Sequence, residues 1–327
     1  MNAPRELPLR PLGTGELLDR ALTIYRGQFK ELFKLSLSFA IVTHLMGKLY
    51  ELVAFAKFPA MLSPRSFVDV PQLGAVVEQV LWMIATTLAA TGLSIALWQA
   101  SVGAVSTDAT HAMTRRPLRA LDAWHRLRPR LPALAATLVL ELVVILATVL
   151  LGAIPLALGV LQNARHPGDN TALALLALGV ALSMLFMFGL FLVTMLRYLL
   201  VPCVVVVENL SGWAALKRAS TLMRGRNVES FWHNPKVRGS LVLLVLGLAT
   251  NAVLLVATLP RSVVLIGSGS ATANLPMQVV LEAIEVIATT AVQPFGMVTL
   301  ALFYLDIRIR REGLDLELAA SELAKAA

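Results

Sequence analysis

Six long apolar stretches constrain this chain more than any other feature of its sequence. Each has at least the roughly 20 residues that an α-helix needs to cross the hydrocarbon core of a bilayer. A backbone in hydrocarbon must satisfy its own hydrogen bonds, and α-helices do so within one segment. We therefore predict an all-α, polytopic membrane protein with six transmembrane helices. They are expected at about residues 35–55, 73–105, 132–161, 171–207, 237–259 and 275–304.

The composition of the chain agrees with a membrane protein. Of its 327 residues, 57% are hydrophobic and 15% are charged, which lies outside the usual composition of soluble domains. In a soluble protein the net charge of +8 would suggest nucleic-acid binding. Here the cations flank apolar spans, where they orient the chain and bind anionic lipid, so no nucleic-acid partner is expected.

A short motif recurs at a period of 99 residues, with copies that begin at Arg20, Arg119 and Arg218. A fixed period indicates a repeated supersecondary unit. We therefore expect one membrane domain over residues 1–327, built from three parallel repeats. Their bounds are about 14–107, 115–207 and 211–304, and a C-terminal amphipathic tail follows at 305–327.

Each copy of the motif has apolar side chains on one helical face and cations on the other. This pattern is typical of an amphipathic helix that lies in a membrane interface, although a surface helix packed on a protein core would also produce it. We predict three cytoplasmic interfacial helices, whose cations form a basic collar that binds the anionic inner leaflet. The collar residues are Arg20, Arg26, Arg119, Arg126, Arg218 and Arg224.

The distribution of cations predicts the orientation in the membrane. Of the 28 Lys and Arg residues, 22 lie in the N-terminal segment, in residues 108–130 and 211–238, and after residue 305. The loops on the other side hold five. By the positive-inside rule, both termini should be cytoplasmic.

Charged residues inside apolar spans are candidates for function, because each costs at least roughly 2.5 kcal/mol at mid-bilayer. Glu141 and Arg197 lie on consecutive spans, each about 15 Å from the cytoplasmic end. They are expected to interact, either as a structural ion pair or as part of a path for substrate or protons; a snorkelling Arg197 is the further alternative.

Three further intramembrane residues are secondary candidates. Glu282 and Glu285 lie one helical turn apart, where they would coordinate a cation or face the outer interface. His44 is expected to be a buried or interfacial histidine whose ring makes a hydrogen bond. The histidines show no metal-binding spacing, and Cys203 is the single cysteine, so we predict no catalytic residue, metal or cofactor.

Three segments resemble the bacterial glycerophosphoryl diester phosphodiesterase membrane-domain family. They are residues 12–26 (LGTGELLDRALTIYR), residues 197–225 with RYLLVP and ALKRA, and residues 304–317 (YLDIRIRREGLDLE), the most specific of the three. In fused members of that family a separate soluble barrel, which needs roughly 250 residues, hydrolyses the phosphodiester. The resemblance therefore implies a stand-alone membrane module without the catalytic domain.

The sequence favours a non-enzymatic integral inner-membrane protein that engages lipid or other membrane proteins. The first alternative is a transporter or channel for a small or lipid-like substrate, suggested by six spans in three repeats and by Glu141 and Arg197. The second alternative is an intramembrane enzyme, although no pairing of nucleophile and base is evident.

Overall fold

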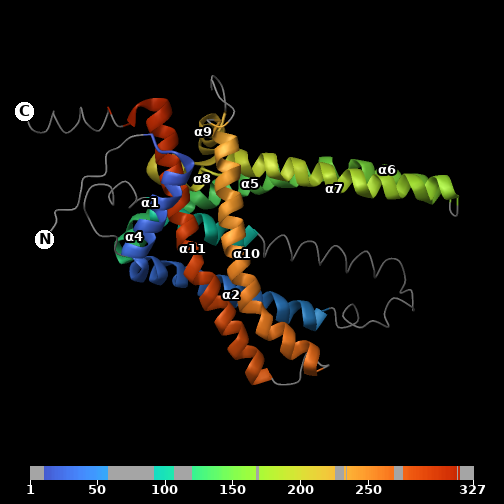
Figure 1. Cartoon of the computed structure of the whole chain (residues 1–327). Coiled ribbons are helices and arrows are strands. Elements are labelled where there is room, and N and C mark those ends of the chain that lie inside the picture. Colours follow the sequence, from blue (N-terminus) through green and yellow to red (C-terminus); the bar gives the residue numbers. More distant parts are fainter. Residues whose placement is uncertain are drawn as a thin grey trace, which may run out of the picture. The chain divides into compact units, whose positions relative to one another are not determined.

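A computed structural model of the chain describes residues 11–57, 92–106, 120–166, 169–224, 232, 234–268, 275–314 and 316. Within these ranges the secondary structure is helical and contains no strand, as predicted (Figure 1). The chain divides into two compact units. Unit 1 comprises Met1–Pro129 and Leu244–Leu302, and unit 2 comprises Arg130–Leu243 and Phe303–Ala327.

Unit 1 contains α1 (Thr14–Gly27), α2 (Phe29–Lys57), the helix Gly92–Ser106 and α4 (Ala120–Leu127), which continues into the short 3₁₀ helix η2 (Arg128–Arg130). It also holds most of α10 (Pro235–Ser268) and α11 (Leu275–Glu312). Side chains of the first two helices donate to the backbone of α11: the hydroxyl of Tyr25 to the carbonyl of Ala291 at 2.9 Å, and that of Ser36 to Thr290 at 3.3 Å. Burial raises the pKa of Tyr25.

Unit 2 contains α5 (Leu131–Gly152), α6 (Ile154–Arg165), α7 (Asn170–Tyr198), α8 (Val201–Val207) and α9 (Gly212–Leu222). The first residues of α10 and the last turns of α11 complete it. Its core lies around α8, where four of the five valines are buried, and includes Leu216, Met223 and Tyr304.

Two prolines interrupt helices that the sequence predicts to be continuous. The expected span at 132–161 breaks at Ala153, because Pro155 has no N–H to donate to the preceding turn. The expected span at 171–207 breaks between α7 and α8, where Pro202 occupies the first turn of the new helix.

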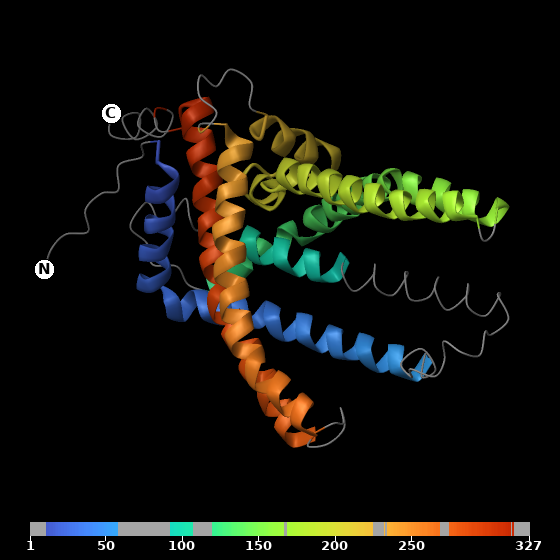
Figure 2. The same ribbon diagram turned by 45° about the vertical axis from the view of Figure 1, so that its right-hand side comes forward.

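Helices α6 and α7 pack closely against each other as a hairpin, and a short connection between residues 165 and 170 joins them (Figure 2). A Cβ on Gly179 would lie 2.6 Å from the carbonyl oxygen of Pro155, so the two backbones approach too closely for a side chain there. The hydroxyl of the buried Ser183 accepts a hydrogen bond of 2.8 Å from the Leu156 N–H. Small residues at such contacts are typical of packed membrane helices.

Five helical segments are long and apolar enough to cross a bilayer: Phe29–Tyr50, Ala120–Gly152, Asn170–Val207, Pro235–Val263 and Val279–Glu312. They correspond to five of the six predicted spans. Most of the remaining predicted span, at 73–105, lies outside the described residues, and its end falls in the apolar helix Gly92–Ser106. Large apolar side chains stay exposed on the hairpin, among them Met184, Leu185 and Phe188, as expected for a surface that faces lipid.

Helices occur at all three copies of the repeated motif, as α1, α4 and α9, and a long helix follows each of them. The division into units crosses the predicted repeat bounds, so the repeats stay a prediction. At the C-terminus, the last span does not end at residue 304 as predicted. Instead, α11 continues without interruption to Glu312, because residues Leu305, Ile307 and Ile309 are buried in unit 2. The tail at 317–327 lies outside the described residues.

Candidate functional site: an ionic clasp in unit 2

Three elements of unit 2 bring together a group of charged and polar side chains. Glu208 is the C-terminal cap of α8, and its backbone N–H donates to the carbonyl of Val204. Asn209 and Gly212, both with φ of 58°, turn the chain into α9, and left-handed backbone of this kind is tolerated best by glycine and asparagine. The N–H of Gly212 then donates to the Thr137 hydroxyl of α5 at 2.8 Å, which fixes the start of α9.

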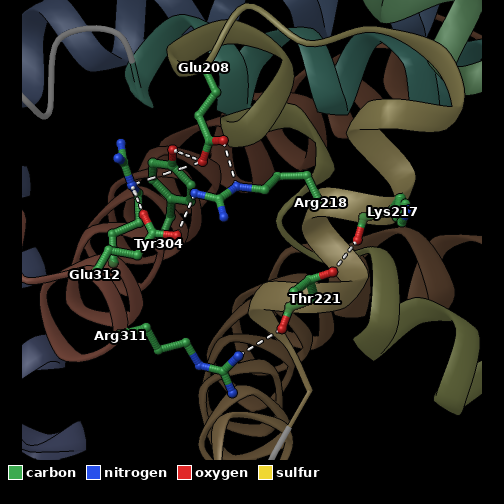
Figure 3. A network of polar contacts seen from close by, with 8 residues as sticks. Glu208, Lys217, Arg218, Thr221, Tyr304, Arg311 and Glu312 are labelled. Atoms are coloured by element: carbon green, nitrogen blue, oxygen red, sulfur yellow. Dashed lines mark hydrogen bonds and ion pairs between the residues drawn. The ribbon is translucent and has the colours of Figure 1, made fainter.

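The central contact of the group is made by Arg218 of α9 (Figure 3). Its Nε lies 2.6 Å from Oε2 of Glu208, and its Nη2 lies 2.5 Å from Oε1 of Glu312. The Tyr304 hydroxyl donates to the other oxygen of Glu208 at 2.8 Å, and Nε of Arg308 donates to the other oxygen of Glu312 at 2.8 Å. We call these five side chains the ionic clasp.

The charges within the clasp balance, because two carboxylates meet two guanidinium groups. Burial disfavours the charged form of Arg218, yet Glu208 and Glu312 together raise its pKa above the ordinary value. Each carboxylate uses both of its oxygens, and charge-assisted hydrogen bonds of this kind are about twice as strong as neutral ones. The clasp therefore holds the end of α11 against the turn between α8 and α9.

A second ion pair lies deeper in the same unit. Nη1 of Arg238, near the start of α10, is 2.6 Å from Oδ2 of Asp306 on α11, and these side chains are 4% and 0% exposed. The guanidinium also lies 5.9 Å from the centroid of the Phe303 ring. Arg310 approaches the same carboxylate at 3.1 Å but is more exposed. This pair joins α10 to α11 within unit 2.

Arg311 links α11 to the end of α9. Its guanidinium donates to the carbonyl oxygens of Thr221, at 2.7 Å, and of Arg224. The last carbonyls of a helix have no partner within the helix, so a cation there stabilises both the hydrogen bonding and the helix dipole. The ends of α9 and α11 and the start of α10 are therefore neighbours.

The arrangement is suited to holding helices together. Within the part of the chain that the structure describes, no group of three or more His, Cys, Asp or Glu residues is placed to hold a metal ion. The carboxylates of the clasp are bound by arginines of the same chain, and so they are not poised as a general base or a nucleophile.

The structure gives Glu141 and Arg197 different surroundings. Glu141 is buried on α5, at 8% exposure. Arg197 is exposed near the end of α7, where its guanidinium lies 5.8 Å from the centroid of the Tyr198 ring. Their interaction stays a prediction.

The six residues of the predicted collar differ in their environment. Arg26, Arg126 and Arg224 are exposed, and Arg20 is half-buried with Glu16 at 3.5 Å. Arg218 is held in the clasp, and Arg119 lies outside the described residues. The apolar face of α9, with Leu216 and Leu222, is buried on protein, so only the opposite face of this helix is open to solvent or lipid.

The secondary candidates Glu282 and Glu285 meet cations of their own chain. Oε1 of Glu282 is 2.8 Å from Nζ of Lys48 and 3.2 Å from Nη2 of Arg261, and Oε2 of Glu285 is 3.6 Å from Nη1 of Arg261. The pairs join α2, α10 and α11 within unit 1. His44, which is half-buried on α2, contributes to the charge environment of Glu282.

Sequence reasoning missed most of the clasp and the buried pair. It placed Tyr304, Asp306, Arg308 and Glu312 only within a motif, and it assigned no role to Glu208 or Arg238. The sequence did contain a signal. Glu208, Asp306 and Glu312 lie at the ends of apolar spans, among arginines, where an unpaired carboxylate would be unfavourable.

Comparison of the chain with protein-family models, with curated proteins and with solved structures finds no match.

Proposed function

We propose that this chain is a non-enzymatic, multi-pass protein of the bacterial inner membrane that engages anionic lipid at its cytoplasmic face. The observation that carries this proposal is a set of exposed cations in unit 2. Lys217 and Arg224 are exposed on α9 and just after it, and Lys236 is exposed at the start of α10. Exposed tryptophans accompany them: Trp213 is 63% exposed and Trp232 is 64% exposed.

Both kinds of residue suit the surface of a membrane. Tryptophan is enriched where a bilayer meets water, because its ring is apolar and its N–H is polar. Each Lys or Arg near an anionic surface contributes about 1 kcal/mol to binding. The clasp supports this assignment, because its carboxylates are matched by Arg218 and Arg308 and do not neutralise the exposed cations.

The lipid preference is tested with the full chain in mild detergent. Phosphatidylglycerol should raise its unfolding temperature more than phosphatidylcholine does, and high salt should reduce the difference. The triple variant Lys217→Gln, Arg224→Gln, Lys236→Gln should bind phosphatidylglycerol about a hundredfold more weakly, from about 1 kcal/mol for each lost cation.

The matched control is Arg165→Gln, which removes an exposed cation from the end of α6 and should leave the preference unchanged. An equal response of the parent to the two lipids would contradict the proposal. A triple variant that keeps the full preference for phosphatidylglycerol would also contradict it.

The proposed orientation places both termini in the cytoplasm, and it follows from the bias of cations along the sequence. Reporter fusions test it independently of lipid binding. Fusions at Ala327 and near His125 should show cytoplasmic activity, and a fusion near Asn163 should show periplasmic activity. The reverse pattern would overturn the orientation.

We also propose that the chain belongs to the glycerophosphoryl diester phosphodiesterase membrane-domain family. The support is the sequence motif at 304–317 together with the segment around Arg218. Four of the five clasp residues, Arg218, Tyr304, Arg308 and Glu312, fall in these two segments, which gives the polar positions of the motifs a structural role.

A further inference from the structure

A polar side chain stands on the exposed surface of α10, within the candidate span Pro235–Val263. Asn251 lies near the middle of this span and is exposed. Its Nδ2 donates a hydrogen bond of 2.8 Å to the carbonyl of Gly247, one turn earlier in the same helix. Within the described part of the chain, the second amide hydrogen and the oxygen of Asn251 have no hydrogen-bond partner.

The residues around Asn251 form an exposed seam along α10. Leu244, Leu248 and Leu255 are 57%, 63% and 63% exposed. With Asn251 they are spaced by alternating steps of four and three residues, which places them on one side of the helix. An apolar seam with a single asparagine is a pattern that fixes the pairing and register of associating helices.

An amide with unused hydrogen-bonding groups is unfavourable in hydrocarbon, because no water is present to satisfy it. Asparagine side chains in membranes therefore hydrogen-bond across neighbouring helices. An amide both donates and accepts, so two asparagines satisfy each other. This self-complementarity identifies a second copy of the same chain as the partner.

We propose that α10 docks against α10 of a second copy of this chain, with Asn251 hydrogen-bonded to its counterpart across the interface. All copies insert into the membrane in one orientation, so the two helices are parallel and each residue meets its counterpart at the same depth. A two-fold axis along the membrane normal relates the copies, and the same surface is used on both. The inference rests on the membrane insertion of α10 and is independent of lipid preference.

Disulfide cross-linking in native membranes tests the geometry of the interface. In a Cys203→Ala background, Leu255→Cys lies about 40° from Asn251 around the helix, whereas Val256→Cys lies about 140° away. Both positions are similarly exposed, at 63% and 68%. Oxidation should yield a covalent dimer from Leu255→Cys and little from Val256→Cys. Equal cross-linking at the two positions, or none at either, would overturn the proposal.

A second measurement tests the role of the amide. Energy transfer between labelled chains, diluted stepwise in liposomes, gives the dimer dissociation constant. Asn251→Leu should raise that constant at least tenfold, whereas Asn251→Gln should stay close to the parent. A parent that is monomeric at every dilution, or an Asn251→Leu variant that associates as well as the parent, would refute the proposal. Resistance to alkaline carbonate extraction shows separately whether the chain is inserted in the membrane. A failure of insertion can therefore be told apart from a failure to form the dimer.

Discussion

Changing Asp306 to asparagine should strongly destabilise unit 2, because it removes the negative charge that is in contact with the buried guanidinium of Arg238. The two side chains are 0% and 4% exposed, and their nearest atoms are 2.6 Å apart. Removing one partner of a buried ion pair costs about 3–5 kcal/mol, and the asparagine keeps the volume of the aspartate, so no cavity adds to this loss. The cation–π contact with Phe303 remains in the variant and offsets part of it.

The stability of the Asp306→Asn variant can be compared with that of two further variants. Arg310 reaches the same carboxylate but is 28% exposed, so Arg310→Gln should cost less than about 1 kcal/mol. The double variant Arg238→Met with Asp306→Leu replaces both charges by apolar groups of similar size. Its stability should return close to that of the parent, because such replacements are often neutral.

The assay is thermal unfolding of the full chain in mild detergent, followed by the loss of the monodisperse peak in size-exclusion chromatography. Asp306→Asn should lower the midpoint on the order of 10 °C, and Arg310→Gln should lower it by no more than a few degrees. If Asp306→Asn melts no lower than Arg310→Gln, the reasoning from burial is refuted. If the double variant is no more stable than Asp306→Asn, the apolar replacement argument fails.

The first two of three further predictions use the same assay, and the third measures the folded yield. Tyr304→Phe removes the hydrogen bond to the glutamate at the end of α8 and should cost about 1.5–3 kcal/mol; an unchanged midpoint would show that this bond contributes nothing. Gly179→Ala should cost about 1–3 kcal/mol, since the new Cβ meets backbone at 2.6 Å, whereas Gly189→Ala on the same helix meets no atom within 4 Å and should be neutral or slightly stabilising. Glu141→Gln and Arg197→Gln should each lower the folded yield, and the charge-swapped double variant should recover part of it; single variants that behave like the parent would exclude an interaction between them and weaken the transporter alternative.

The length and spacing of apolar residues determined much of the helical structure. An apolar run longer than a bilayer is thick and a period of 3.6 residues are both local properties of the sequence. They predicted the five helices that are long and apolar enough to cross a bilayer, and the positions of α1, α4 and α9. The effect of a proline was less predictable. Pro155 and Pro202 stand at helix breaks, whereas Pro294 lies inside the continuous helix α11. Neighbouring groups decide whether a membrane helix tolerates the missing hydrogen bond.

The pairing of charges was decided by the tertiary structure alone. Glu208 and Tyr304 are 96 residues apart in sequence, and Arg238 and Asp306 are 68 apart, yet each pair is in hydrogen-bond contact. The sequence predicted that Arg218 belongs to a lipid-facing helix face, but in the structure its guanidinium lies between Glu208 and Glu312. Periodicity reports which residues share one helix face, whereas the partner of a charge depends on which helices pack together. That choice is made by long-range burial, so a local pattern can show that a charge needs a partner but not which residue the partner is.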